Sequence, residues 1–350
     1  MDQANSLKEM KLVEGFEWPK DPPAQLLQQC LKDLDRAFLN FFKGSGFPKF
    51  KRRGQKDSFR FPEPKQFSIE KITNKYCYVK LPKIGRVKFR KTRDIEGRIR
   101  NATICREGKH WYISFNSEIE SEIPQNLGSA IGIDRGVAKT VALSNEENYS
   151  LPEKIKFLEK RISVLQKRLR LKKKFTENWK KLKRKIAKLH QKIARIRHNW
   201  LHKISTRIAK NHSYVVLEDL KTKNMSKSAS GTVEKPGKNV AAKSGLNRSI
   251  LRQGWHKLEV FLSYKCDWYG SYLELVSPHY TSQECSNCGH ICKENRISQE
   301  LFCCQNCGYE ENADINSAKV ILTRGRRGSA CGDVDIGRIC EAGTTNYAFA

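Results

Sequence analysis

Two pairs of cysteines in the last quarter of the chain constrain this sequence more than any other feature. Each pair has the form Cys-x-x-Cys, and 15 residues separate the pair Cys285/Cys288 from the pair Cys304/Cys307. Zn²⁺ prefers thiolate ligands, and a closed structural site needs four of them, so this spacing predicts one tetrahedral zinc site. A glycine follows the second cysteine of each pair, and its tolerance of positive φ lets backbone amides turn toward the sulfurs.

The other cysteines carry a weaker signal. Cys303 directly precedes Cys304 and offers an alternative ligand, although Cys304 alone completes the second Cys-x-x-Cys pair. The first ten residues contain no apolar segment typical of a secretory signal, so we expect a cytoplasmic protein. That location disfavours disulfides, and the remaining cysteines are predicted to be small packing residues.

The charge of the chain points to a polyanionic partner. The 350 residues contain 67 Lys and Arg against 37 Asp and Glu, a formal net charge of +30. Nucleic acid is the partner that such a balance favours. A membrane partner is not expected, because no apolar run approaches the roughly 20 residues needed to span a bilayer.

Most of this charge lies in one segment. Residues 151–210 hold 22 Lys and Arg against 3 acidic residues, so they contribute 22 − 3 = +19. Apolar residues recur at heptad-like spacing on both sides of a break at Lys172–Glu177, which predicts two helices folded as a hairpin. Cations would then cover the outer faces. A charge run can be a solvated face, but an excess this large favours contact with a nucleic-acid backbone.

The N-terminal third predicts one helix followed by strands. Apolar residues at steps of four and three predict an amphipathic helix over residues 24–42, with its apolar face packed in a core. Residues 47–61 interleave cations with aromatics, which suits either nucleic-acid contact or a β-edge with solvated cations. Short β-rich runs between residues 67 and 120 favour a small antiparallel barrel, and residues 124–128 read as a linker.

Three acidic residues stand at the ends or starts of apolar elements. Asp134 ends a short buried-type strand, Glu218 ends a second one, and Asp314 opens an apolar helical pattern seven residues after Cys307. A carboxylate near the centre of a sheet is costly unless it holds a metal or a partner, and we favour a metal. Three carboxylates at one end of a mixed sheet suit two Mg²⁺ ions and phosphodiester cleavage.

The remaining segments have weaker patterns. Residues 224–247 lack periodicity and are a candidate lid or substrate-contact loop. A helix is predicted over residues 248–264, apart from Gly254. After a last helical stretch at residues 318–322, the Gly-rich tail 324–350 is predicted to be disordered.

These motifs resemble the TnpB family, transposon-associated OrfB-type proteins related to type V CRISPR effectors. The resemblance rests on GIDRG around Asp134, VVLEDL around Glu218, NADINSAKVI around Asp314 and the two cysteine knuckles. It implies an α/β RNase H-like (RuvC) nuclease with a mixed sheet, interrupted by a basic helical hairpin and a four-cysteine zinc ribbon. A small β-barrel wedge domain with a short helical lobe would precede it.

The resemblance also implies a prokaryotic, nucleoid-associated protein and a set of domain boundaries. We expect a partial helical recognition lobe at 1–46, the wedge at 47–126, and the first part of the nuclease at 127–280 with the hairpin at 152–210. The zinc ribbon would follow at 281–310, the last part of the nuclease at 311–323, and the tail at 324–350. TnpB-like chains usually begin some tens of residues earlier, with a first wedge strand and a recognition helix.

The implied activity is RNA-guided, Mg²⁺-dependent cleavage of double-stranded DNA, with a guide RNA transcribed from the end of the element. Asp134, Glu218 and Asp314 match the catalytic, Mg²⁺-binding positions, and Cys285, Cys288, Cys304 and Cys307 match the ligands of one structural zinc. Arg296, between the knuckles, could reach the scissile phosphate or be an ordinary surface arginine. The alternative functions are a non-cleaving RNA- or DNA-binding protein and a strand-joining transposase.

Overall fold

The computed structural model describes residues 5–6, 9–52, 54 and 57–330 of the chain. It divides into two compact units, with the division between Glu122 and Ile123. In the described part of the chain, no helix has both the length and the apolar character that a membrane-spanning segment needs.

The first unit begins with the predicted helix α2, which spans Ala24–Phe42 and so matches its expected bounds. None of its residues is buried, and Leu34 on the apolar face is 45% exposed. Leu26 packs against the core of the strands that follow, and the ring of Phe47 lies edge-on to Phe38. The expectation that the apolar face packs into a core is therefore met only in part.

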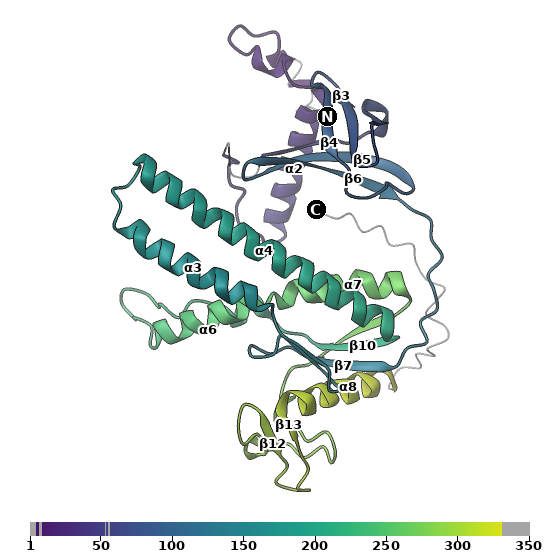
Figure 1. Ribbon diagram of the computed structural model, residues 1–350, viewed down its shortest axis with the longest axis vertical. Coiled ribbons are helices and arrows are strands. Elements are labelled where there is room, and N and C mark those ends of the chain that lie inside the picture. The colour runs from purple at the N-terminus through teal and green to yellow at the C-terminus, as the bar shows by residue number, and fades with distance from the viewer. Residues whose placement is uncertain (1–4, 7–8, 53, 55–56, 331–350) are drawn as a thin grey trace. The chain divides into compact units, whose positions relative to one another are not determined.

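Two three-stranded antiparallel sheets make up the rest of this unit (Figure 1). Their orders are β1-β5-β6 and β2-β3-β4, and apolar residues of both sheets form one core around Phe61 and Val79. The predicted β-rich runs are thus confirmed as strands, while closure into a barrel stays a prediction. The strands are β1 Ser58–Phe61, β2 Ser68–Lys71, β3 Tyr76–Leu81, β4 Gly85–Arg90, β5 Arg98–Glu107 and β6 His110–Glu118, with short 3-10 turns at Trp18–Lys20 and Pro64–Gln66.

The second unit is built on a mixed five-stranded sheet of order β11-β10-β7-β8-β9. The strand β10 runs parallel to both β7 and β11, whereas β7, β8 and β9 are joined antiparallel. The strands are β7 Ala130–Asp134, β8 Val141–Leu143, β9 Asn148–Tyr149, β10 Tyr214–Glu218 and β11 Tyr272–Val276. The mixed sheet predicted for the nuclease is therefore present.

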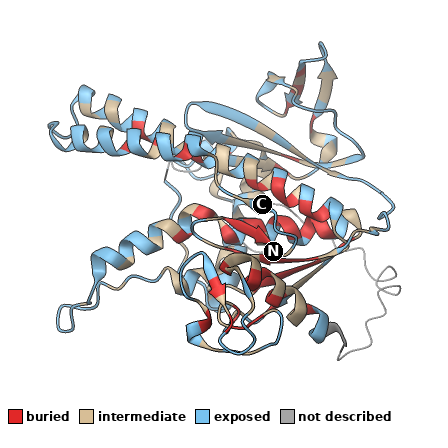
Figure 2. Ribbon diagram, turned by 60° about the horizontal axis from the view of Figure 1, so that its bottom comes forward, coloured by how far each residue is buried: buried red, intermediate tan, exposed pale blue. Residues whose placement is uncertain are grey.

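Helices cover both faces of this sheet. Alternate residues of β10 point to opposite faces, as a period of two requires. Val215 and Leu217 pack with residues of α4 (Glu177–Asn211) and α7 (Trp255–Tyr269), and Val216 packs against Ile321 of α8 (Ala313–Ala330). Figure 2 shows the buried residues concentrated in these layers.

The basic segment forms the predicted helical hairpin (Figure 1). The helices are α3 (Glu153–Arg170) and α4, and the loop between them, residues 171–176, matches the predicted break to within one residue. Ile155, Ile162 and Ile186 are buried in the seam between the two helices. The C-terminal half of α4 leaves this seam and packs on the sheet, where Leu201 is fully buried.

Several local predictions need correction. The segment expected to be an unpatterned loop, residues 224–247, overlaps the end of α5 (Thr222–Met225), and helix α6 (Val240–Gln253) already begins inside it. Gly254, in a left-handed conformation with φ of 76°, separates α6 from α7. Helix α8 continues to Ala330, so the expected disorder of residues 324–330 is wrong, while residues 331–350 lie outside the described residues.

The predicted linker at residues 124–128 is anchored to the second unit. The side-chain amide of Asn126 donates hydrogen bonds to the backbone oxygen of Ala209 at 3.0 Å and to Ser271 Oγ at 2.8 Å. This partly buried amide, with its partners, holds the start of β7 against the end of α4.

Candidate active site and metal centre

The sheet places Asp134 and Glu218 side by side. Leu217 of β10 pairs with Ile133 of β7, and the two strands run parallel, so the next residue of each strand lies at the same end of the sheet. Both strands are short and almost wholly apolar before this point, because the sheet is covered on both faces. The two acids therefore end neighbouring buried strands.

Helix α8 brings Asp314 to the same end. It crosses β7 at Gly132, where a Cβ atom would lie 2.1 Å from the backbone oxygen of Ala318. Glycine is thus required at position 132 for the helix to pack this closely. Asp314 lies in the first turn of the helix, one turn before Ala318.

The three carboxylates act on each other electrostatically. Burial, which has the largest effect, and the charges of Glu218 and Asp314 together raise the pKa of Asp134 to about 7. Like charges gathered in a partly desolvated site disfavour ionisation and favour a bound cation. The structure therefore brings together the three acids that the sequence analysis singled out.

Glu218 is held by two groups that the sequence analysis did not assign. The hydroxyl of Thr281 donates a hydrogen bond of 2.5 Å to Glu218 Oε1, and Arg135 donates to the backbone oxygen of Glu218. Burial raises the pKa of Glu218, against the opposing effects of Thr281, Arg135 and Arg324. The carboxylate is thus buried and fixed in orientation.

Arg135 ties the ends of these strands to helix α7. Its side chain is fully buried, and it pairs with the carboxylate of Glu259 at 3.0 Å and contacts the backbone oxygen of Trp255. A buried guanidinium needs such partners, because an unpaired buried charge is strongly destabilising. Its place directly after Asp134 in GIDRG was the one available sequence signal.

Arg296 lies beside Asp314, with a distance of 3.5 Å between its guanidinium nitrogen and Asp314 Oδ1. The same side chain donates to the backbone oxygen of Gln299 at 3.2 Å. This arginine is therefore next to the candidate carboxylates and partly exposed.

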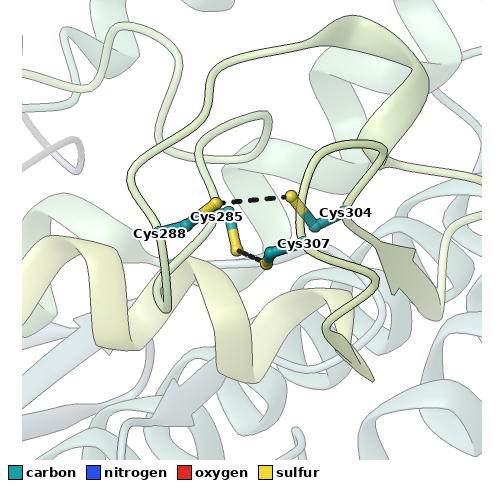
Figure 3. A group of neighbouring side chains, drawn as sticks. All are labelled: Cys285, Cys288, Cys304 and Cys307. Atoms are coloured by element: carbon teal, nitrogen blue, oxygen red, sulfur yellow. Dashed lines mark hydrogen bonds between the residues drawn. The ribbon is translucent and has the colours of Figure 1, made fainter.

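The four cysteines form a compact ligand cluster (Figure 3). All four sulfur atoms lie within 4.8 Å of one another, with 3.8 Å between Cys285 and Cys307 and 3.6 Å between Cys288 and Cys304. A tetrahedral zinc–thiolate site, with Zn–S bonds of about 2.3 Å, spaces its sulfurs by roughly 3.8 Å. The cluster can therefore hold one zinc ion. Among the residues that the structure describes, no other set of metal-ligand side chains is gathered this tightly.

The knuckles have the backbone that the glycines predict. Gly289 and Gly308 have φ of +75° and +69°, and the backbone amide of His290 lowers the pKa of Cys288 to about 6. Cys303 does not join the cluster, and its thiol contacts Glu310 instead. The reading in which Cys304 completes the second pair is thus confirmed.

The cysteine module contains β12 (Leu301–Cys303), β13 (Glu310–Asn312) and a 3-10 turn at Lys293–Asn295. One buried asparagine, Asn316, joins it to helix α8. Asn316 of α8 accepts from the backbone amide of Ser286 at 2.9 Å and donates to the backbone oxygen of Glu284 at 2.8 Å. Arg324 also pairs with Glu284. The helix that carries Asp314 is thereby fastened to the first knuckle, which nothing in the sequence pattern indicated.

Comparison with known proteins identifies the family. Residues 114–229 match a family described as "Probable transposase" (OrfB_IS605), and residues 255–321 match "Cas12f1-like, TNB domain". The chain is 46% identical over 333 residues to "Putative RNA-guided DNA endonuclease InsQ" of Escherichia coli K12, covering 95% of this chain and 82% of that protein. It is 29% identical over 331 residues to "Putative RNA-guided DNA endonuclease" of Streptomyces pristinaespiralis, covering 94% and 78%.

A solved structure shares the fold. The likeness to the cryo-EM structure of the Cas12f1–sgRNA–target DNA complex has a TM-score of 0.55 at 18% identity and covers 85% of this chain and 70% of that chain. At this identity the likeness concerns the fold alone. Together with the InsQ alignment over nearly the whole chain, these matches confirm the resemblance drawn from the motifs: the chain belongs to the TnpB family of OrfB-type proteins.

Proposed function

We propose that the chain is an RNA-guided DNA endonuclease of a transposable element, with Asp134, Glu218 and Asp314 as its catalytic acids. The observation that carries this proposal is the convergence of the three carboxylates: Asp134 and Glu218 end neighbouring parallel strands, and the charges of Glu218 and Asp314 both act on Asp134. Family membership supports the guide RNA and the double-stranded DNA target, since InsQ bears the name of such an enzyme.

The finer architecture belongs to the same proposal. We infer an RNase H-like RuvC nuclease in the second unit, supported by the mixed sheet with β7, β8 and β9 antiparallel and β10 and β11 parallel to β7. In the first unit, the two sheets with one shared core support the wedge barrel.

The carboxylates fit hard divalent cations, because all three supply oxygen ligands in one partly desolvated cluster. Two Mg²⁺ ions held by these acids would activate the attacking water and stabilise the leaving 3′-oxygen. The chain's own contribution is orientation: Thr281 fixes the Glu218 carboxylate, and Arg135 fixes its backbone. Arg296 would exchange its pairing with Asp314 for the scissile phosphate.

Plasmid cleavage with the cognate guide RNA and Mg²⁺ tests this function. Asp134→Ala should abolish cleavage while RNA binding persists. Asp219→Ala is the matched control, because this substitution also removes one negative charge, at the residue directly after Glu218. Asp219 pairs with Lys221 at the surface. Equal cleavage by wild type and Asp134→Ala would refute the assignment. RNA binding by a wild-type protein that never cleaves would favour the non-cleaving alternative.

A further inference from the structure

The tip of the helical hairpin is the most basic part of the chain's most basic segment. Between residues 168 and 185, at the end of α3, the loop and the start of α4, ten side chains are Lys or Arg and one is acidic. The single acid, Glu177, pairs with Lys180 at 2.9 Å. The tip therefore carries a large uncompensated positive charge.

The loop holds an aromatic ring out in solvent at a conformational cost. Phe175 has φ of +68°, in the left-handed region that bulky side chains rarely adopt, and it is 75% exposed. The next residue, Thr176, caps α4 by accepting from the backbone amide of Trp179 at 3.3 Å. An exposed ring receives little stabilisation from burial, and its strained backbone costs free energy. Fold stability therefore does not explain Phe175, which points to a role in binding.

Phe175 is part of an aromatic pair. Its ring centroid lies 5.7 Å from that of Trp179 at an interplanar angle of 47°. The ammonium of Lys183 lies over the Trp179 ring, 4.8 Å from its centroid. The pair thus forms a small ring surface edged by a cation.

At the same end of the hairpin, residues of the two helices and of the loop line an open pocket of about 500 Å³. Four cations line it, two from each side of the hairpin: Arg168, Lys172, Lys181 and Lys185. Leu171 and Leu182 supply its apolar lining, and no acidic residue contributes to it. All four cations are exposed, so phosphate groups could reach them.

We propose that the hairpin tip binds a single-stranded stretch of nucleic acid, with an unpaired base on Phe175 and Trp179 and neighbouring phosphates on the pocket cations. Aromatic rings next to a cationic groove are how proteins bind single strands. Bases inside a duplex are stacked on each other and offer no face to such a ring. The inference rests on the proposed function, which supplies two sources of single strand: the guide RNA and the displaced DNA strand.

Binding of labelled 20-nucleotide oligo-uridine RNA and oligo-thymidine DNA, and of a 20-base-pair DNA duplex, tests this inference in the full chain without Mg²⁺. The variant is Phe175→Gly with Trp179→Ala, since glycine adopts the positive φ and keeps the turn. Single-strand affinity should fall roughly 5- to 150-fold, the range for losing one stacked base, with duplex affinity unchanged. Circular dichroism should show unchanged helix content.

A charge variant separates stacking from phosphate contact. Lys172→Ala with Lys181→Ala should lower the slope of log affinity against log salt by about 0.7 for each lost contact, whereas the aromatic variant should leave the slope unchanged. Lys109→Ala with Lys257→Ala is the matched control, with equal charge loss on exposed residues outside the hairpin.

The outcomes divide cleanly. A loss with the RNA alone assigns the tip to the guide, and a loss with the DNA alone assigns it to the displaced strand. An aromatic variant that binds single strands like wild type, or that loses single strands and duplex equally, overturns the inference. Cleavage by the wild type is measured separately, so a failure of the proposed function does not affect this result.

Discussion

The hydroxyl of Thr281 donates a hydrogen bond of 2.5 Å to Oε1 of Glu218, across 63 positions of the chain. Thr281 lies four residues before the first cysteine of the metal cluster, and Glu218 ends the strand β10. One hydrogen bond therefore links the start of the cysteine module to a candidate catalytic acid.

Replacing Thr281 by valine should raise the Mg²⁺ requirement of cleavage. Valine keeps the shape but removes the donor, and a hydrogen bond to a charged group contributes about 1.5–3 kcal/mol. We expect the Mg²⁺ midpoint to rise roughly tenfold or more, measured by plasmid cleavage over a Mg²⁺ titration. Thr281→Ser retains the hydroxyl and should behave like wild type. An unchanged midpoint in the valine variant would show that this bond does not orient Glu218.

Asp134→Asn should stabilise the fold when no divalent cation is added. Burial and the neighbouring carboxylates raise the folded-state pKa of Asp134 to about 7 from its usual 3.8. The folded chain then binds the proton more tightly than the unfolded chain, so wild-type stability falls as pH rises from about 4 to 7. The melting temperature of the variant should exceed that of wild type by more at pH 8 than at pH 5. Asp219→Asn, at the surface, should show no such difference in melting temperature from wild type between the two pH values. A wild type that melts at pH 8 at the same temperature as Asp134→Asn, or higher, would contradict the expectation.

Lys265 should make a second pH-dependent contribution to stability, one that rises with pH rather than falling as that of Asp134 does. Its ammonium is buried and donates only to neutral oxygens, those of His202, Ser205 and Thr206, at 2.7–2.8 Å. Burial lowers its pKa to about 8 from 10.5. The folded chain loses this proton at a lower pH than the unfolded chain does, so stability should rise with pH between about 8 and 10.5.

Urea unfolding of wild type and Lys265→Met at pH 7, 9 and 10 measures this contribution. Methionine cannot titrate, so the rise with pH should be smaller in the variant, which should be at least as stable as wild type at pH 7. Lys257→Met, which removes an exposed cation from the same helix, is the control. The same rise in both variants would exclude Lys265 as its source.

Cys288→Ser should release the metal and destabilise the cysteine module, because structural zinc contributes folding free energy directly. Metal content by mass spectrometry should fall from one zinc per chain toward none. Cleavage should fall as well, because Asn316 fastens the first knuckle to the helix of Asp314. Cys292→Ser is the control, since Cys292 lies outside the cluster and contacts Glu294. Retention of one zinc by Cys288→Ser would show that the ligand assignment is wrong.

The elements with strong periodicity were predictable from the residues alone. The helix at Ala24–Phe42 and the two helices around the loop at residues 171–176 follow apolar spacings that only one secondary structure satisfies. Where the pattern was weak, the prediction failed. Helix α6 begins at Val240 inside a Lys-, Ser- and Gly-rich segment, and α8 runs through three glycine or serine positions past Thr323, because tertiary packing outweighs modest propensities.

By itself, the sequence determined the ligand set of the metal module and the chemical type of the candidate catalytic residues. Cysteine spacing constrains a short loop directly. A carboxylate at the end of a buried strand costs free energy unless it binds a metal or a partner. Only the tertiary structure decided which groups orient those acids. Thr281 reaches Glu218 and Asn316 reaches Ser286 across contacts that no local pattern encodes, since strand register and helix crossing bring them together. Gly132 allows that crossing, because a side chain there would occupy the path of α8.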